Sequence, residues 1–149
     1  MSSPPRPGAS EARIGKSVTR SEDARFLTGR ACYVDDFKLP GLCHAMIVRS
    51  RVASGRIRRI DASAASVVPG VVRVLTYEDI SEFALPIPIR VGAIEGLERY
   101  LQRPLAQDSV RYVGEPLAVV IAADRYIAED ASDLVEVEID ESEPVVSIS

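Results

Sequence analysis

The most regular pattern of apolar and polar residues lies in the last third of the chain. The apolar run LAVVIAA at 117–123 has the length and β-branching of a buried strand, and Asp124 after it is a candidate helix N-cap. Four apolar residues then share one helical face, namely Ile127, Ala131, Leu134 and Val135. The stretch VEVEID at 135–140 alternates apolar and acidic residues, as a half-exposed strand does. We expect a strand-helix-strand unit, with a right-handed crossover if its two strands are parallel neighbours.

Shorter patterns predict further elements in the middle of the chain. LCHAMIVRS at 42–50 predicts a strand that is buried on both faces. A short strand then precedes a weak helix that begins near Asp61 or Ser63 and stops at Pro69-Gly70. VVRVL at 71–75 predicts another strand.

Turn signals follow this strand. Thr76, with Asp79 three residues later, resembles a capping box and predicts a single helical turn. From Glu82 to Pro104 the prolines alternate with apolar residues, so we expect a long loop that ends in a short helix at Glu95–Gln102. The predicted fold class is α+β, or mixed α/β, with a mixed β-sheet, few short helices and a C-terminal strand-helix-strand unit.

Size and composition indicate one globular domain. The chain has 149 residues, 46% hydrophobic and 27% charged, and a chain of this size buries a core without disulfides or metals. The start, MSSPPRPGASEA, lacks the apolar core of a signal peptide. We expect a disordered arm at 1–13, one domain at 14–146 and a tail at 147–149. The longest apolar run, 117–123, is far shorter than the roughly 20 residues that span a bilayer, so we expect a soluble, cytoplasmic protein without a membrane partner.

The charge pattern argues against a nucleic-acid partner. The formal net charge is −4, whereas phosphate binding needs a clustered positive surface. One local exception is RSRVASGRIRR at 49–59, whose five arginines are Arg49, Arg51, Arg56, Arg58 and Arg59. No aromatic residue is interleaved with them, so we expect a solvated edge or ion pairs with acids such as Glu136 and Glu138.

Two acidic pairs, Glu22-Asp23 and Asp35-Asp36, invite a reading as an acid/base or metal site. Such sites need carboxylates that converge on one point, but adjacent residues point in different directions. We expect Glu22, Asp23 and Arg25 to cap and pair around a turn, and Asp35-Asp36 to accept backbone N–H groups.

No other residue pattern predicts chemistry. Cys32, Cys43 and His44 do not have the spacing of zinc ligands, and neighbours on a strand point apart, so we expect free thiols and a structural histidine. YVGEP at 112–116 precedes a strand and has one glycine, which indicates a tight turn and not a dinucleotide loop. The sequence therefore predicts no catalytic, cofactor-binding or metal-binding residue in this chain.

Four stretches in order carry a family resemblance: IGKSVTRSEDARFLTGRACYVDDFKLPG, VRS, IRRIDASAASVVPGVVRVLTYEDI and RPLAQDSVRYVGEPLAVVIAADRYIAEDASDLVEVEID. From about Ile14 to Val145 the chain resembles the N-terminal a/b hammerhead domain of molybdenum hydroxylase large subunits. That group includes aerobic carbon monoxide dehydrogenase, xanthine dehydrogenase and aldehyde oxidase. Ala31, Arg51 and Ser54 depart from the family pattern, in which Gly, Pro and His are usual at these positions.

The resemblance implies an a/b hammerhead-like fold and a chain that is not catalytic alone. In the family the molybdopterin cofactor, the substrate pocket and the catalytic glutamate belong to the domains that follow. We therefore expect a structural and assembly domain, as a split subunit or a fragment, of a molybdopterin-dependent enzyme that oxidises or hydroxylates an aldehyde, a purine or carbon monoxide. The alternative is a free-standing protein-interaction module that kept the fold and lost the enzyme.

The same resemblance implies the cofactors and partners. We expect no cofactor in this chain, molybdopterin in the full complex, and iron–sulfur clusters and FAD on partner subunits. The expected partner is a molybdopterin-binding large-subunit domain or chain, with the iron–sulfur and FAD subunits as further candidates and a homo-oligomer when the chain is isolated. We expect the N-terminal arm and Arg25–Asp36 to bind this partner, with apolar anchors at Phe26, Leu27, Tyr33 and Phe37.

Overall fold

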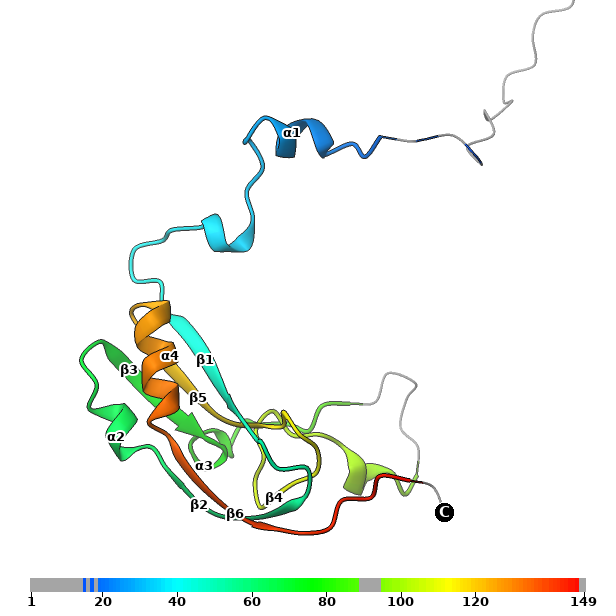
Figure 1. Cartoon of the computed structure of the whole chain (residues 1–149), viewed down its shortest axis with the longest axis vertical. Coiled ribbons are helices and arrows are strands. Elements are labelled where there is room, and N and C mark those ends of the chain that lie inside the picture. Colours follow the sequence, from blue (N-terminus) through cyan, green and yellow to red (C-terminus); the bar gives the residue numbers. More distant parts are fainter. Residues whose placement is uncertain (1–14, 16, 18, 89–94, 148–149) are drawn as a thin grey trace, which may run out of the picture. The chain divides into compact units, whose positions relative to one another are not determined.

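The computed structural model describes residues 15, 17, 19–88 and 95–147 (Figure 1). The chain divides into two compact units, Met1–Leu39 and Pro40–Ser149, each with its own elements. The arm expected at 1–13 lies outside the described residues, and the expected domain bounds stay a prediction.

The first unit has two short helices and no buried residue among those described. α1 spans Asp23–Leu27, and the 3-10 helix η1 spans Val34–Asp36. The rings of Phe26 and Tyr33 stack with their centroids 5.1 Å apart. Because so little apolar surface is removed from water, this unit depends on local hydrogen bonds and on this one ring pair.

The first sheet of the second unit has the strand order β1-β5-β3, and both pairings are antiparallel. The strands are β1 (His44–Arg49), β3 (Val71–Thr76) and β5 (Pro116–Ala122). β5 lies in the centre, where Leu117 and Ala118 are buried on opposite faces. A central strand covered on both sides explains the continuous apolar run, and the strand predicted at 117–123 is confirmed.

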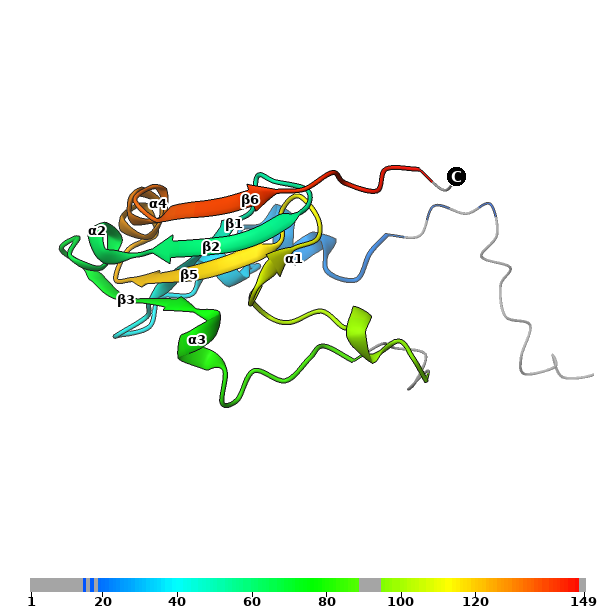
Figure 2. The same cartoon turned by 90° about the horizontal axis from the view of Figure 1, so that it is seen from below.

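The second sheet has the order β4-β2-β6, again antiparallel, and Figure 2 shows β2 running alongside β6. The strands are β2 (Gly55–Asp61), β4 (Ser109–Val110) and β6 (Glu136–Glu141). In β6, Val137 and Ile139 are half-buried while the acids between them are exposed. The alternation predicted for this stretch is confirmed.

The helices of the second unit are α2 (Ser63–Ser66), α3 (Tyr77–Ile80), the 3-10 helix η2 (Glu98–Tyr100) and α4 (Arg125–Asp133). The two with a predicted cap, α3 and α4, begin at that cap. The carboxylate of Asp124 accepts the N–H of Tyr126 at 2.8 Å, which confirms the N-cap of α4. The N–H of Thr76 donates to Asp79 Oδ2 at 2.8 Å, so the capping box is confirmed. This hydrogen bond holds the pKa of Asp79 below its ordinary value.

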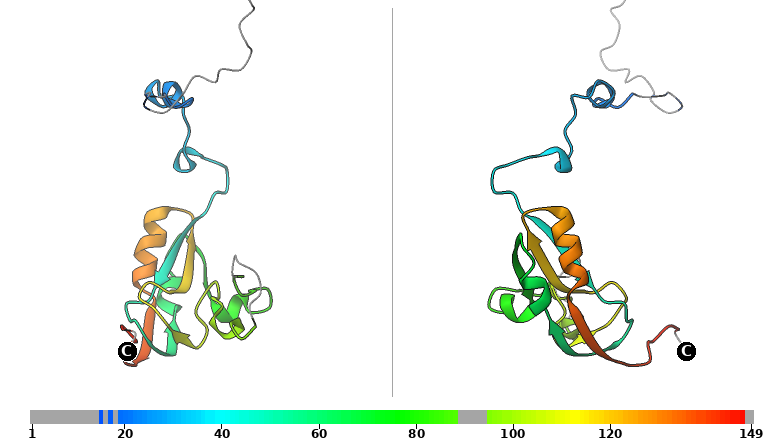
Figure 3. Two further views of the ribbon diagram at one scale, coloured as in Figure 1. Left: turned by 90° about the vertical axis from the view of Figure 1, so that its right-hand side faces the viewer. Right: turned by 60° about the vertical axis from the view of Figure 1, so that its left-hand side comes forward.

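Two apolar clusters form the core. α4 lies against the strands of the β1-β5-β3 sheet (Figure 3), and the small side chain of Ala131 lets it approach Val120 of β5. Ala65 of α2 and Val135 complete this first cluster. The second cluster joins Leu117 to two further buried residues, Ala106 and Val110.

The α+β class is confirmed, but the sheet arrangement differs from the expectation. The described strands form two antiparallel sheets in place of one mixed sheet, and β5 and β6 belong to different sheets, so they are not parallel neighbours. The prediction that 42–50 is buried on both faces is wrong. β1 is an edge strand, and Met46 and Ile47 are each 39% exposed.

Candidate docking surfaces

A groove of about 600 Å³ lies between β1, an edge strand of the first sheet, and β6, an edge strand of the second. We name it the β1–β6 groove. Its lining comes from Met46–Val52, Leu117, Ser132, Asp133, Val135, Val137, Ile139 and Glu141. Val48, Val135 and Val137 belong to the core clusters or pack against them, so the floor is an exposed extension of the core. Such a floor is suited to receiving apolar side chains.

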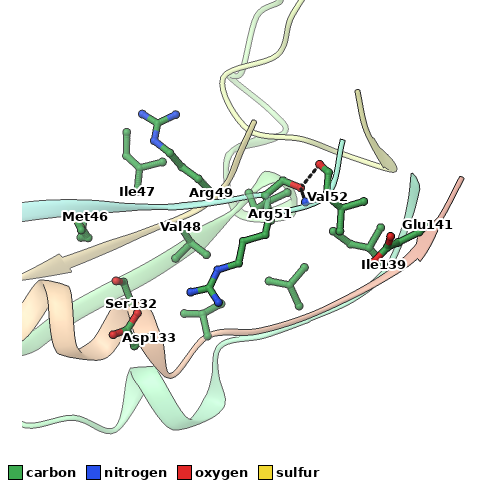
Figure 4. A pocket seen from close by; sticks show the side chains of 14 residues that line it. Met46, Ile47, Val48, Arg49, Arg51, Val52, Ser132, Asp133, Ile139 and Glu141 are labelled. Atoms are coloured by element: carbon green, nitrogen blue, oxygen red, sulfur yellow. Dashed lines mark hydrogen bonds between the residues drawn. The ribbon is translucent and has the colours of Figure 1, made fainter. Parts of the chain in front are cut away.

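Arg51 brings a positive charge into the groove, whose lining also contains the acids Asp133 and Glu141. Figure 4 shows its side chain extending into the groove, on the side of Ser132 and Asp133, whereas Arg49 points away from the groove. Within the described part of the chain, the Arg51 guanidinium makes no hydrogen bond or ion pair. The hydroxyl of Ser50 donates to the carbonyl of Val52 at 2.8 Å and so fixes the turn that carries Arg51.

The YVGEP turn contacts the end of β1 and the residue that follows it. Gly114 has φ +91°, and its N–H donates to the carbonyl of Ser50 at 2.8 Å. The N–H of Ser50 in turn donates to the carbonyl of Glu115 at 2.9 Å, and Arg49 Nη1 donates to the carbonyl of Gly114 at 2.8 Å. These bonds join the turn to the end of β1, and the tight turn predicted at 112–116 is confirmed.

Glu115 is a buried carboxylate that the sequence analysis missed. Its side chain is 5% exposed and accepts the N–H of Arg111 at 2.6 Å, while Arg111 Nη2 lies 3.4 Å from the other carboxylate oxygen. Arg111 stands four residues before Glu115, and Glu115 leads into a buried strand. This spacing is the signal that could have indicated a buried carboxylate with an arginine partner.

The acidic pairs of the first unit serve turns. The N–H of Arg20 donates to Asp23 Oδ2 at 3.2 Å, and the N–H of Tyr33 donates to Asp36 Oδ2 at 2.8 Å. Glu22 and Arg25 form an exposed ion pair at 3.8 Å. The capping and pairing expected for Glu22, Asp23 and Asp36 are therefore confirmed.

The arginines of β2 form ion pairs with other partners than expected. Arg58 pairs with Asp140, and Arg59 pairs with Asp61, in place of Glu136 and Glu138. The reason is a register shift between Ile57 and Arg59, which gives Arg58 no direct partner in β6 and leaves it to reach Asp140.

Arg59 is not the main cause of the lowered pKa of its ion-pair partner Asp61. Hydrogen bonds from the hydroxyl and N–H of Ser63 hold the pKa of Asp61 below its ordinary value, and Arg59 adds to the effect.

Cys32 and Cys43 are exposed free thiols. They belong to different units, and His44 starts β1 beside Cys43. Nowhere in the described ranges do three or more His, Cys, Asp or Glu side chains gather as metal ligands would. Likewise, none of the described helices has both the length and the apolar character needed to cross a membrane.

The first unit exposes large apolar side chains, which soluble proteins usually bury. Leu27 is 86% exposed, Tyr33 63% and Phe37 55%, while Phe26 is 40% exposed beside Tyr33. Arg25 and Arg30 lie on the same short segment. Aromatic residues with neighbouring arginines are enriched at the centres of protein interfaces, so this segment is the second candidate docking surface.

Comparison with known proteins gives the family. The family described as "Aldehyde oxidase and xanthine dehydrogenase, a/b hammerhead domain" matches residues 28–143. The nicotine 6-hydroxylase large subunit of Paenarthrobacter nicotinovorans is 48% identical over 133 residues, which are 89% of this chain and 16% of that protein.

Solved structures agree with this match. Quinoline 2-oxidoreductase from Pseudomonas putida 86 superposes with a TM-score of 0.77 at 42% identity, over 91% of this chain and 17% of that chain. The Cu,Mo-CO dehydrogenase gives a TM-score of 0.75 at 40% identity, over 90% and 16%. The chain thus spans only a small part of the length of the proteins it matches, and it belongs to the a/b hammerhead domain family of aldehyde oxidases and xanthine dehydrogenases.

Proposed function

We propose that this chain is a non-catalytic structural and assembly domain of a molybdopterin-dependent oxidoreductase large subunit. The chain is a split subunit or a piece of that large subunit. The observation that carries the proposal is the exposed apolar segment of the first unit, from Phe26 to Phe37, in a chain that matches 16% of a large subunit. A segment with this much exposed apolar surface gains stability when another domain covers it.

The segment has the composition of an interdomain face. Such faces bury about 600–1,500 Å² and are moderately polar. Phe26 and Tyr33 are already stacked, so they lose little side-chain freedom when a partner covers them. Arg30 Nε donates to the hydroxyl of Thr28 at 3.1 Å, which leaves its terminal nitrogens for a partner. When the chain is isolated, we expect the same surface to promote self-association.

The molybdopterin belongs to the partner in this proposal. In the family that this chain resembles, the cofactor belongs to the domains that follow the hammerhead domain, so no reaction step is assigned to this chain. The partner is the molybdopterin-binding domain or chain, with iron–sulfur and FAD subunits as further members of the complex. The substrate is a small molecule such as an aldehyde, a purine or carbon monoxide. Two exposed free thiols favour a reducing, cytoplasmic compartment.

Co-purification tests the proposal. The chain is expressed with the molybdopterin-binding part of the large subunit as a separate tagged chain, and the two are recovered together by the tag. We expect Phe26→Ala and Tyr33→Ala to reduce recovery. Tyr126→Ala is the matched control, because Tyr126 is 68% exposed but lies on α4 of the second unit. Circular dichroism checks that each variant is folded.

The alternative is a free-standing interaction module, which the same aromatic and arginine segment also suits. Failure of the wild-type chain to co-purify, or equal recovery of both segment variants and the wild type, would favour this alternative.

A further inference from the structure

We propose that the β1–β6 groove binds an extended segment of the molybdopterin-binding part of the large subunit, which pairs with the free edge of β1 and sets a carboxylate against Arg51. This inference rests on the proposed function, because it names a second contact with the same partner. It concerns only the second unit and is independent of the aromatic segment in the first.

The two walls of the groove are sheet edges. β1 is the last strand of one sheet and β6 is the last strand of the other, and each pairs on one side only among the described strands. The outer N–H and C=O groups of such a strand form a template for another extended chain. Met46–Val52 line the β1 wall; of these, Met46–Arg49 belong to the strand and Ser50–Val52 to the turn that follows it, so the strand edge available for pairing ends at Arg49.

The floor favours apolar side chains at alternate positions of the occupant. Val48 packs against the core cluster around Val120, and Val137 packs against both clusters. Side chains entering at this point would extend the core and remove these valines from water. A groove of about 600 Å³ suits a few side chains of an extended segment, whereas a helix about 10 Å in diameter needs more room.

Arg51 favours an acidic residue in the occupant. The groove lining also contains Asp133 and Glu141, but among the described residues neither forms an ion pair with the Arg51 guanidinium, which extends into the groove (Figure 4). Any segment that fills the groove removes this charge from water, which is unfavourable unless a carboxylate pairs with it. Arginine binds a carboxylate through two parallel hydrogen bonds, so an acidic residue of the occupant is the fitting partner.

The partner chain fits the groove better than a second copy of this chain does. β1 has the sequence HAMIVR and contains no acid, so a copy paired through the same edge would leave Arg51 without a carboxylate. The partner is the larger body, because this chain matches only 16% of a related large subunit.

Binding to the separately expressed molybdopterin-binding chain tests the inference by calorimetry. We expect Arg51→Glu to weaken binding about thirtyfold or more, as the loss of a buried ion pair does, and Arg51→Lys to weaken it less. Arg73→Glu is the control, because Arg73 lies on β3, at the opposite edge of the same sheet. Hydrogen exchange should show added protection of the β1 amides in the complex.

Each outcome decides between the two proposals. If the wild-type chain does not bind, both proposals are wrong. If it binds and Phe26→Ala weakens binding, while Arg51→Glu does not and β1 gains no protection, the groove inference alone is wrong. Protection of β1 that depends only on the concentration of the isolated chain would identify a second copy as the occupant and would also overturn the inference.

Discussion

Replacing Gly70 with alanine is expected to destabilise the second unit by about 2–3 kcal/mol. Gly70 has φ +94°, where an L-residue costs about 1–2 kcal/mol. The new Cβ would also lie 2.7 Å from Ile127 Cδ1 of α4. That methyl can turn aside in part, so overpacking adds about 1 kcal/mol. The backbone cannot relax freely, because the N–H of Ala123 donates to the Gly70 carbonyl at 2.9 Å.

Gly114→Ala is the matched control for this prediction. Gly114 has φ +91° but no atom within 4 Å of a Cβ, so alanine there should cost only the conformational part. Ile127→Val removes the methyl that clashes, and in that background Gly70→Ala should cost about as much as Gly114→Ala. Urea unfolding followed by circular dichroism measures each free energy of unfolding. Equal losses for both glycine variants, or no relief from Ile127→Val, would refute the steric reasoning.

Four further predictions follow from individual residues. Asp36→Ala should cost about 0.5–2 kcal/mol of stability in the first unit, the range for a lost cap, because Asp36 accepts the N–H of Tyr33; an unaltered melting curve would contradict the capping role. Glu115→Ala should cost about 1.5–3 kcal/mol, the worth of a hydrogen bond to a charged group, whereas Glu115→Gln keeps an acceptor for the Arg111 N–H and should cost less; the reverse order in urea unfolding would contradict this. Because the folded pKa of Asp79 is lowered, its stabilisation is present above the unfolded pKa and is lost as pH falls through the folded pKa. Asp79→Asn should therefore have a lower free energy of unfolding than wild type near neutral pH, and this difference should shrink in acid; a difference that stays constant with pH would contradict it. Elemental analysis and absorption spectra of the purified chain should show no molybdenum, flavin or iron–sulfur cluster, and a stoichiometric amount of any of them would contradict the assignment of cofactors to the partner.

Local elements of this fold could be predicted because their signals are local. The apolar run of β5 reflects burial on both faces, and the alternation in β6 reflects burial on one. Asp124 and Thr76 begin helices through bonds to residues two and three positions away. A capping interaction of this range is encoded by spacing alone.

The sheet arrangement could not be predicted, because pairing joins distant segments. The arginines at 49–59 favour acids such as Glu136 and Glu138 as neighbours, but the apolar pattern of β2 does not indicate that it pairs with β6, some eighty positions later, and not with a strand near it. The same is true of the candidate site. Glu115 is buried where the turn before β5 meets the end of β1, and the groove beside Arg51 lies between β1 and β6, whereas the acidic residues that stood out in the sequence bind only their own turns. A short acidic cluster has enough nearby N–H groups to be satisfied locally.

Native mass spectrometry of the co-expressed chains tests the central claim most directly. The chain is produced with the separate molybdopterin-binding part of the large subunit, and the intact complex and its dissociated chains are weighed. An assembly domain without cofactor predicts a complex that contains both chains, with the molybdopterin mass on the partner alone. Molybdopterin retained on this chain, or two chains that never form a complex, would contradict the claim.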